Sequence, residues 1–274
     1  MTAGLERLCF GTSTFVAGRL FPGKDSGPGI AALRTALQSG VRLIHSNPNL
    51  DTQWAVREVL DSTEPIPGLR HLVKAECPLQ GDLEGRVNTA IEVSAGRLGI
   101  RRISAVVLEI DLKRTGRTAL LHDRRALGAF FRTGARVAFA SGRVDAVYAY
   151  CHGPEALAAA LREEAIGAVA TQYHLSSPWA RSYLARVERA GKPFIGMSPL
   201  NRGALVDVLA PTPDARLRPL AWALDDPRVS AVAVTMSSPE HVREVVDTVR
   251  KSERSRGRDL YTGRTDPKER VSRD

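Results

Sequence analysis

The chain has 274 residues, of which 43% are hydrophobic and 25% charged, and these values exclude a disordered chain or one that needs disulfides or metals to fold. The length matches the roughly 250 residues of one eight-stranded α/β barrel. The net charge of +9 does not indicate nucleic-acid binding, because only 5% of the residues are aromatic and they are not interleaved with basic residues. A small-molecule substrate, anionic if it uses this charge, is the expected partner.

The cysteines and the start of the chain bear on its compartment. Cys9, Cys77 and Cys151 are scattered, odd in number and without metal-ligand spacing, as expected in a reducing compartment. No charged-then-apolar signal opens the sequence, and no apolar run approaches the ~20 residues of a membrane span. We therefore expect a cytoplasmic protein that does not interact with membranes.

Short β-branched runs alternate with longer amphipathic stretches, a rhythm typical of parallel strands joined by crossover helices. The predicted strands are Arg7–Gly11, Val41–His45, His71–Glu76, Ile103–Asp111, Ala146–Tyr150, Ala168–Gln172, Phe194–Ser198 and Ala231–Thr235. The predicted helices are Gly29–Ser39, Thr52–Leu60, Leu83–Leu98, a fourth within Arg114–Arg143, Glu155–Glu164, Ala180–Ala190, Arg218–Leu224 and Pro239–Val249. This order predicts the α/β class and a (β/α)8 TIM barrel.

The barrel is expected to be one domain over residues 1–252, because no Gly-, Ser- or Pro-rich linker divides it. Residues 253–274 are expected to form a charged C-terminal tail. From Arg250 to Asp274 there are nine Lys or Arg and five Asp or Glu, a difference of +4 that supplies part of the net charge.

Ordered segments across nearly the whole chain resemble the aldo-keto reductase superfamily. They are the opening strand Leu8–Thr12, Ala32–Gly40 with Val41–Pro48, the lysine strand Leu72–Lys74, Arg97–Gly99 before the fourth strand, the loop Ser198–Gly203, and Asp226–Pro227 with Ser237–Glu240. Their order and spacing, rather than any single match, carry the resemblance.

The resemblance implies an NADPH-dependent carbonyl reductase in which a tyrosine donates the proton, helped by a lysine, an aspartate and a histidine. Carried over position by position, only Lys74 remains. His45, Leu50 and Glu109 stand at the aspartate, tyrosine and histidine positions. Because Leu50 has no proton to donate, we predict a divergent member of the superfamily with a degenerate catalytic tetrad.

The positions expected to hold the cofactor also depart from the family's pattern. Met197 stands where an aromatic residue stacks on the nicotinamide, and Ala170 where a glutamine holds its carboxamide, unless the register slips by two residues to Gln172. Ser237 and Val245 stand at frequent arginine and asparagine positions near the adenosine phosphate. We therefore expect no cofactor, with NADPH as the alternative.

Five ionisable side chains are the catalytic candidates. Alternate residues of a barrel strand face inward, and active sites lie at the carboxyl ends of the strands. With Lys74 facing inward, Glu76 and Glu109 share that face, and His45 and His152 end or follow their own strands. Grouping them in one pocket would split their pKa values, as general acid–base catalysis requires.

The main hypothesis is a non-redox lyase or isomerase, in which Glu109 or His45 is the base, its partner the acid, and Lys74 stabilises an oxyanion or enolate. Dehydration, elimination, isomerisation or cyclisation of a small metabolite, for instance in specialised metabolism, would all fit. The predicted substrate-binding residues are Asn47, Asp111, Tyr150, Gln172 and Met197. Expected cofactor- or anion-binding residues, near outward-pointing backbone N–H groups, are Ser198, Leu200, Arg202, Ser237 and Ser238.

Structural explanations stay open for the same residues. Lys74 and Glu109 could form a buried ion pair inherited from the scaffold, and His45 could be a hydrogen-bonded core histidine. Glu76 and Asp111 could cap or end their strands in solvent. Tyr148, Tyr150 and Tyr173 are typical of strand cores, although one of them could replace the missing acid.

Two further expectations concern metals and the remaining histidines. The His and carboxylate candidates come from different strands without a local spacing motif, so we expect no metal. His71, His122 and His241 are expected at the surface.

Two other classes of function remain open. An NADPH-dependent oxidoreductase of carbonyl substrates with an atypical proton donor is favoured by the retained loops. A non-catalytic binding subunit is favoured by the missing tyrosine.

Overall fold

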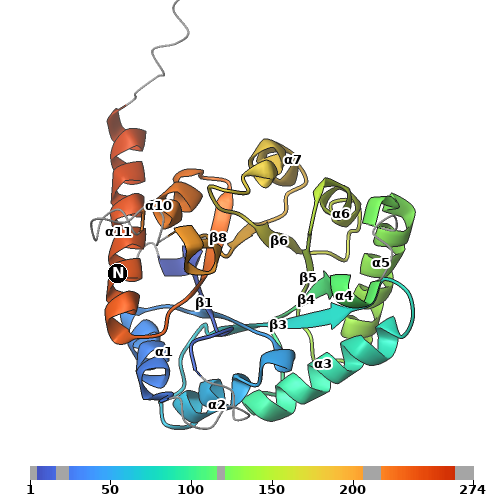
Figure 1. Cartoon of the computed structure of the whole chain (residues 1–274), viewed down its shortest axis with the longest axis horizontal. Coiled ribbons are helices and arrows are strands. Elements are labelled where there is room, and N and C mark those ends of the chain that lie inside the picture. Colours follow the sequence, from blue (N-terminus) through green and yellow to red (C-terminus); the bar gives the residue numbers. More distant parts are fainter. Residues whose placement is uncertain (1–4, 17–24, 116–120, 206–216, 263–274) are drawn as a thin grey trace, which may run out of the picture.

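The computed structural model describes residues 5–16, 25–115, 121–205 and 217–262. Eight parallel strands close into a barrel in sequence order, and β8 pairs with β1 (Figure 1). The strands are β1 (Leu8–Gly11), β2 (Leu43–Ser46), β3 (Arg70–Cys77), β4 (Ala105–Ile110), β5 (Val147–Tyr150), β6 (Ala168–Gln172), β7 (Phe194–Met197) and β8 (Val229–Thr235). The predicted (β/α)8 barrel is therefore confirmed.

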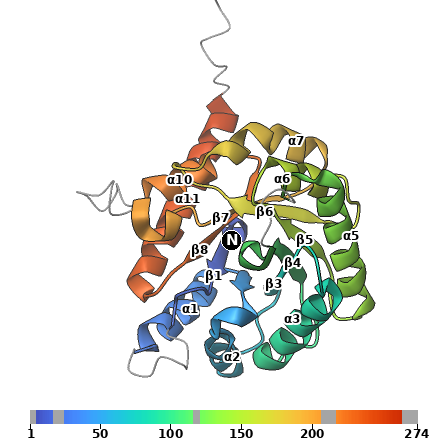
Figure 2. The same cartoon turned by 45° about the vertical axis from the view of Figure 1, so that its right-hand side comes forward.

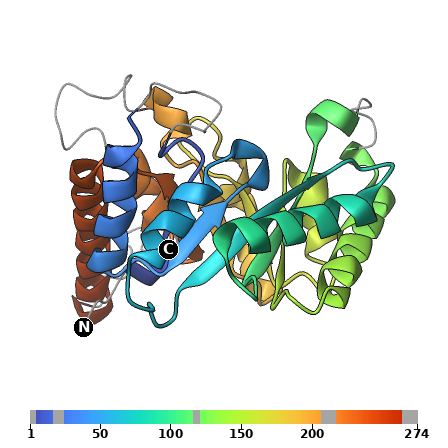
Figure 3. The same cartoon turned by 90° about the horizontal axis from the view of Figure 1, so that it is seen from below.

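Helices surround the barrel and cover the outward faces of its strands. They are α1 (Gly27–Ser39), α2 (Gln53–Asp61), α3 (Leu83–Leu98), α4 (Leu112–Thr115), α5 (Arg124–Ala140), α6 (Pro154–Ala160), α7 (Leu184–Arg189), α10 (Arg218–Asp225) and α11 (Pro239–Thr262), with the short 3-10 helices η1 (Leu5–Arg7), η2 (Pro48–Leu50), η4 (Trp179–Tyr183) and η5 (Asn201–Gly203). α10 and α11 lie side by side next to β8 (Figure 2), and α11 also packs along α1 (Figure 3). Among the described helices, none combines the length and apolar character needed to cross a membrane.

Several helices differ from their predicted bounds; α6, for example, ends at Ala160 rather than at Glu164. The segment after β4 divides into α4 and α5, and Asp123 caps α5 by accepting hydrogen bonds from the N–H groups of Arg125 and Ala126. The helix predicted from Ala180 begins as the 3-10 helix η4. α11 continues to Thr262, past the predicted end at Val249. Between Val249 and Arg254, the last residue of α11 whose burial is described, no further residue is buried, but the charged residues there are good helix formers.

Strand alternation divides the side chains into two cores. Inward-facing residues from all eight strands, among them Leu72, Val107 and Met197, pack inside the barrel. Outward-facing residues such as Val73 and Leu108 pack against the helices. Since Leu72 faces inward and Val73 outward, Lys74 also faces inward, as predicted from the alternation.

Candidate active site

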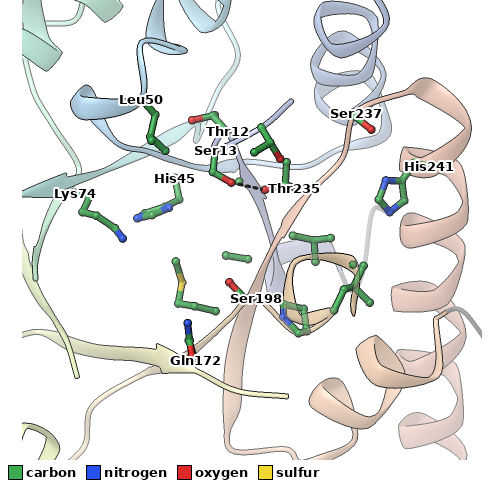
Figure 4. A pocket seen from close by; sticks show the side chains of 18 of the residues that line it. Thr12, Ser13, His45, Leu50, Lys74, Gln172, Ser198, Thr235, Ser237 and His241 are labelled. Atoms are coloured by element: carbon green, nitrogen blue, oxygen red, sulfur yellow. Dashed lines mark hydrogen bonds between the residues drawn. The ribbon is translucent and has the colours of Figure 1, made fainter. Parts of the chain in front are cut away.

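One large cavity lies at the carboxyl ends of the strands and has a volume of about 1130 Å³. We call its two ends the lysine end, formed by His45, Lys74, Glu109, Tyr150 and His152, and the α11 end, formed by Ser237, Ser238, Glu240, His241 and Glu244. Figure 4 shows Lys74 and His45 on one side of the cavity and Ser237 and His241 on the other. Gln172, Met197, Ser198 and Leu200 line the stretch between them.

Lys74, Glu109 and His152 form a connected row at the lysine end. The Lys74 ammonium makes an ion pair with Oε2 of Glu109, and Nε2 of His152 lies 3.1 Å from Oε1 of the same carboxylate. The exposed fractions of the Lys74 and Glu109 side chains are 16% and 11%, whereas that of His152 is 25%. The row therefore leads from a largely buried ammonium to an imidazole that reaches solvent.

The carboxyl group of Glu109 is ionised in this setting. Burial alone would raise its pKa, but the hydrogen bond from His152 and the charge of Lys74 outweigh burial and hold the pKa below its usual range. Glu109 is therefore a proton acceptor at neutral pH, and the ammonium of Lys74 is the group beside it that carries an acidic proton.

His45 is neutral and lies in the wall of the same cavity. The pKa of its imidazole is lowered to about 3, mostly by burial and also by the charge of Lys74, while the charge of Glu109 opposes both. Its Nε2 atom is buried and has no hydrogen-bond partner among the described residues. A buried polar atom without a partner is costly unless a ligand satisfies it, so His45 can hydrogen-bond a molecule placed beside Lys74.

The aromatic ring of Tyr150 completes the lysine end. The ammonium nitrogen of Lys74 lies 4.9 Å from the centre of this ring, which is a cation–π arrangement. The rings of Tyr150 and His152 are 5.0 Å apart between their centres. Of the three strand tyrosines, Tyr173 instead lies fully buried, with its ring stacked on Trp222.

Glu76 and Asp111 lie outside this cavity and line a neighbouring one of about 480 Å³, together with Arg86 and Arg97. The Glu76 carboxylate accepts hydrogen bonds from the amides of Asn47 and Asn49 at 2.8 and 3.0 Å, and it lies 3.9 Å from Nζ of Lys74. The structure thus places Glu76 beside the lysine but turns it toward the adjacent loop.

Asn47 is not among the residues that line the main cavity, either. Its side-chain oxygen accepts the backbone N–H of Asn49 at 2.9 Å and so caps η2, and Asp111 accepts the N–H of Lys113 at 3.0 Å at the start of α4. Both side chains therefore fix local turns. Leu50, which follows this cap, does line the main cavity and is 42% exposed.

Gln172, rather than Ala170, faces the cavity. Ala170 is buried inside the barrel between Tyr150 and Ile195 of the neighbouring strands. Gln172 lies two residues further along β6, where its amide is exposed to the cavity. Of these two positions on β6, it is thus Gln172 whose side chain lines the cavity.

The segment after β7 also lines the cavity. Met197 and Leu200 are each 8% exposed there, and Ser198 between them has a left-handed backbone with φ of 54°, which is uncommon for a residue other than glycine. The side chain of Arg202, which was predicted to bind an anion, lies outside the described part of the structure.

Sequence reasoning missed several cavity residues. Thr12 and Ser13 follow β1, and the Ser13 hydroxyl lies 3.0 Å from that of Thr235 at the end of β8. Glu240, His241 and Glu244 come from the first two turns of α11. All of these residues lie at the carboxyl end of a predicted strand or at the start of the following helix. That position alone could have predicted that they line the cavity.

Two histidines predicted at the surface lie elsewhere. His71 is only 6% exposed, because it faces outward from β3 beneath the helices, and burial lowers its pKa to about 4. His241 is half-buried and lines the cavity. His122 is exposed, as predicted.

The cysteines do not take part in the candidate site, and the described residues form no metal site. All three cysteines are buried and unpaired, and burial raises the pKa of the Cys77 thiol to about 12. Among the described residues, no three His, Cys, Asp or Glu side chains gather in a way that could hold a metal ion.

Comparison with known proteins identifies the fold. No family model matches the chain, and no curated protein matches it in sequence. An aldo-keto reductase from Klebsiella pneumoniae in complex with NADP and acetate matches with a TM-score of 0.70 and 17% identity, covering 98% of this chain and 95% of that one.

Two other solved structures are similar. A thermostable aldo-keto reductase in complex with the inhibitor epalrestat matches with a TM-score of 0.67 and 16% identity over 89% of each chain. A glycerol dehydrogenase from Gluconobacter oxydans matches with a TM-score of 0.64 and 16% identity, covering 98% of this chain and 95% of that one. The chain therefore has the aldo-keto reductase fold, as a divergent barrel of low sequence identity to these enzymes.

Proposed function

We propose that the protein is an oxidoreductase that reduces a carbonyl group with a nicotinamide cofactor, and that Lys74 donates the proton usually given by a phenol. The observation that carries this proposal is the continuous cavity between the lysine end and the α11 end. Its volume of about 1130 Å³ is above the roughly 300–1,000 Å³ of pockets that hold one small ligand. It offers room for an extended cofactor and a substrate together.

The residues between the two ends fit such a cofactor. The exposed amide of Gln172 can pair with a carboxamide, and Met197 presents a polarisable apolar face beside it. Ser198, Leu200 and the α11 end line the rest of the path. When bound, a reduced nicotinamide supplies the hydride; the protein's own groups position the substrate and deliver the proton.

Proton delivery follows from the row at the lysine end. Lys74 hydrogen-bonds the substrate oxygen and gives it a proton as negative charge develops there. Glu109, which is ionised between Lys74 and His152, passes a replacement proton from the solvent-contacting imidazole to the lysine amine. His45 remains neutral and offers its unpaired Nε2 to the substrate oxygen.

Binding and turnover test this proposal separately. Titration of the purified protein with reduced nicotinamide dinucleotides, followed by calorimetry, is expected to give a dissociation constant in the micromolar range. Lys74→Met is expected to abolish aldehyde or ketone reduction while leaving dinucleotide binding within about threefold. This variant leaves the Glu109 carboxylate buried without its partner, which could destabilise the fold. The double variant Lys74→Met, Glu109→Gln removes both charges and is therefore the control for folding. Full reduction activity in both variants, or no dinucleotide binding at all, would overturn the proposal.

A second candidate is non-redox acid–base chemistry at the same residues. It is favoured by Leu50, which removes the expected phenol, and by the ionised Glu109 beside an ammonium, because a base and an oxyanion-stabilising group are then already assembled. Cofactor-free exchange of solvent deuterium into an acidic C–H group of a ketone, lost in Glu109→Gln, would support this candidate. Absence of exchange, together with dinucleotide binding, would exclude it.

A further inference from the structure

Two exposed leucines line the cavity near its lysine end. Among the described residues, four large hydrophobic ones are exposed, and two of these, Leu50 and Leu112, line the cavity with exposed fractions of 42% and 45%. Leu50 ends η2, which follows β2, and Leu112 begins α4, which follows β4. Since β2 and β4 are the neighbours of β3, the two leucines come from the segments on either side of the strand that carries Lys74. Figure 4 shows Leu50 on the same side of the cavity as Lys74 and His45.

Backbone hydrogen bonds hold the segments that carry both leucines. The N–H of Leu50 donates to the carbonyl of Asn47 at 3.1 Å, and the N–H of Asp111, directly before Leu112, donates to the carbonyl of Cys77 at 2.8 Å. Single exposed leucines are ordinary on a protein surface, but two in the wall of one cavity form an apolar surface of the kind that marks a binding site. An apolar group of a ligand that covers them would be bound favourably.

The charged groups of the lysine end are already paired with one another. Lys74 makes an ion pair with Glu109 and lies 3.9 Å from Glu76, and His152 contacts the same Glu109 carboxylate. Among the residues whose side chains are described, no other Lys or Arg lines the cavity. A carboxylate or phosphate on a substrate would therefore lose its water without meeting an unpaired Lys or Arg, which is costly. Hydroxyl groups beside the two leucines would likewise find no hydrogen-bond partner in them.

We infer that the substrate is an uncharged aldehyde or ketone whose substituent is apolar, an alkyl chain or an aromatic ring. Leu50 and Leu112 hold this apolar group, while the carbonyl oxygen lies beside Lys74 and His45. The inference rests on the proposed function and names its substrate class. It gives a binding role to Leu50, which stands at the position of the missing phenol, and it excludes the anionic substrate that the net charge of +9 would favour.

Reduction of three aldehydes, with reduced nicotinamide dinucleotide in excess, tests the inference. Hexanal carries an alkyl chain, glyceraldehyde carries hydroxyl groups, and succinic semialdehyde carries a carboxylate. We expect kcat/KM for hexanal to exceed that for either polar aldehyde by at least about tenfold. Leu50→Ser and Leu112→Ser should each lower the ratio of kcat/KM for hexanal to kcat/KM for glyceraldehyde by about tenfold, because each removes apolar contact with the alkyl chain. Both leucines are exposed, so neither change should prevent folding.

Leu175→Ser is the matched control. Leu175 is 38% exposed but does not line the cavity, so the same change there should leave the ratio within about twofold. Equal kcat/KM for the three aldehydes, or an unchanged ratio in both cavity variants, would overturn this inference alone, because carbonyl reduction would still occur. Reduction of none of the three aldehydes would overturn the proposed function and this inference with it.

Discussion

The two ends of the cavity use charge in opposite ways. At the lysine end, the ammonium of Lys74 and the carboxylate of Glu109 are largely buried and neutralise each other. At the α11 end, Glu240 and Arg243 are 70% and 63% exposed and pair in solvent. Burial makes the first pair strongly interdependent and leaves the second weak. Loss of one charged partner should therefore matter far more at the lysine end than at the α11 end.

Breaking the buried pair should have the largest effect on stability. Glu109→Leu leaves the Lys74 ammonium without its counterion, and we expect the free energy of unfolding to fall by about 3–5 kcal/mol. Urea denaturation measures this change. Glu84→Gln is the control, since it breaks an exposed ion pair with Arg136 and should cost less than about 1 kcal/mol. Equal losses in both variants would contradict the contrast between buried and exposed charge.

Acid should destabilise the protein through its buried histidines. The folded-state pKa values of His45 and His71 are lowered to about 3 and about 4. As pH falls below the ordinary value near 6.5, the unfolded chain binds protons that the folded chain refuses, so stability decreases. Each histidine contributes up to about 1.4 kcal/mol per pH unit. The midpoint of urea unfolding, followed from pH 7.5 to pH 5, should decrease accordingly.

Replacement of His71 isolates one part of this pH dependence. His71→Leu should flatten the curve of stability against pH, because it removes one buried titrating group that does not line the cavity. His122→Leu, at an exposed position, should leave the slope unchanged. An unaltered slope in His71→Leu would show that burial of this histidine does not control its protonation.

Introducing a phenol at the lysine end should change the rate of carbonyl reduction, which is the smallest effect that we expect. Leu50 is exposed in the cavity wall, so Leu50→Tyr is expected to be tolerated and to increase carbonyl reduction by about tenfold through a second proton donor. Leu50→Phe supplies the same ring without a hydroxyl and should give no increase. Identical rates in the two variants would argue against proton transfer as the step that limits turnover.

Strand alternation predicted the fold and the lysine end well. The eight strands, the inward direction of Lys74 and the nearness of Glu109 to it follow from a two-residue repeat in parallel strands in register. The same repeat, read outward, would have placed His71 with Val73 beneath the helices. Its assignment to the surface came from residue type, which is a weaker guide than position.

Loops and helix starts limited prediction of the remaining site. Alternation gave Glu76 the same face as Lys74, but hydrogen bonds from Asn47 and Asn49 turn its carboxylate toward the neighbouring loop. Glu244 and His241 reach the cavity only because α11 begins at its rim. Such placements depend on where a helix packs against the barrel, which the local sequence does not encode.

The three buried cysteines can be used to detect local unfolding of the chain. Cys9 lies inside the barrel, Cys77 at the end of β3 and Cys151 directly after β5, and each is inaccessible in the folded chain. Alkylating reagents can therefore modify a given cysteine only while its surroundings are transiently open. Mass spectrometry of alkylated peptides would rank these openings along the chain, with the barrel interior at Cys9 recording cooperative unfolding.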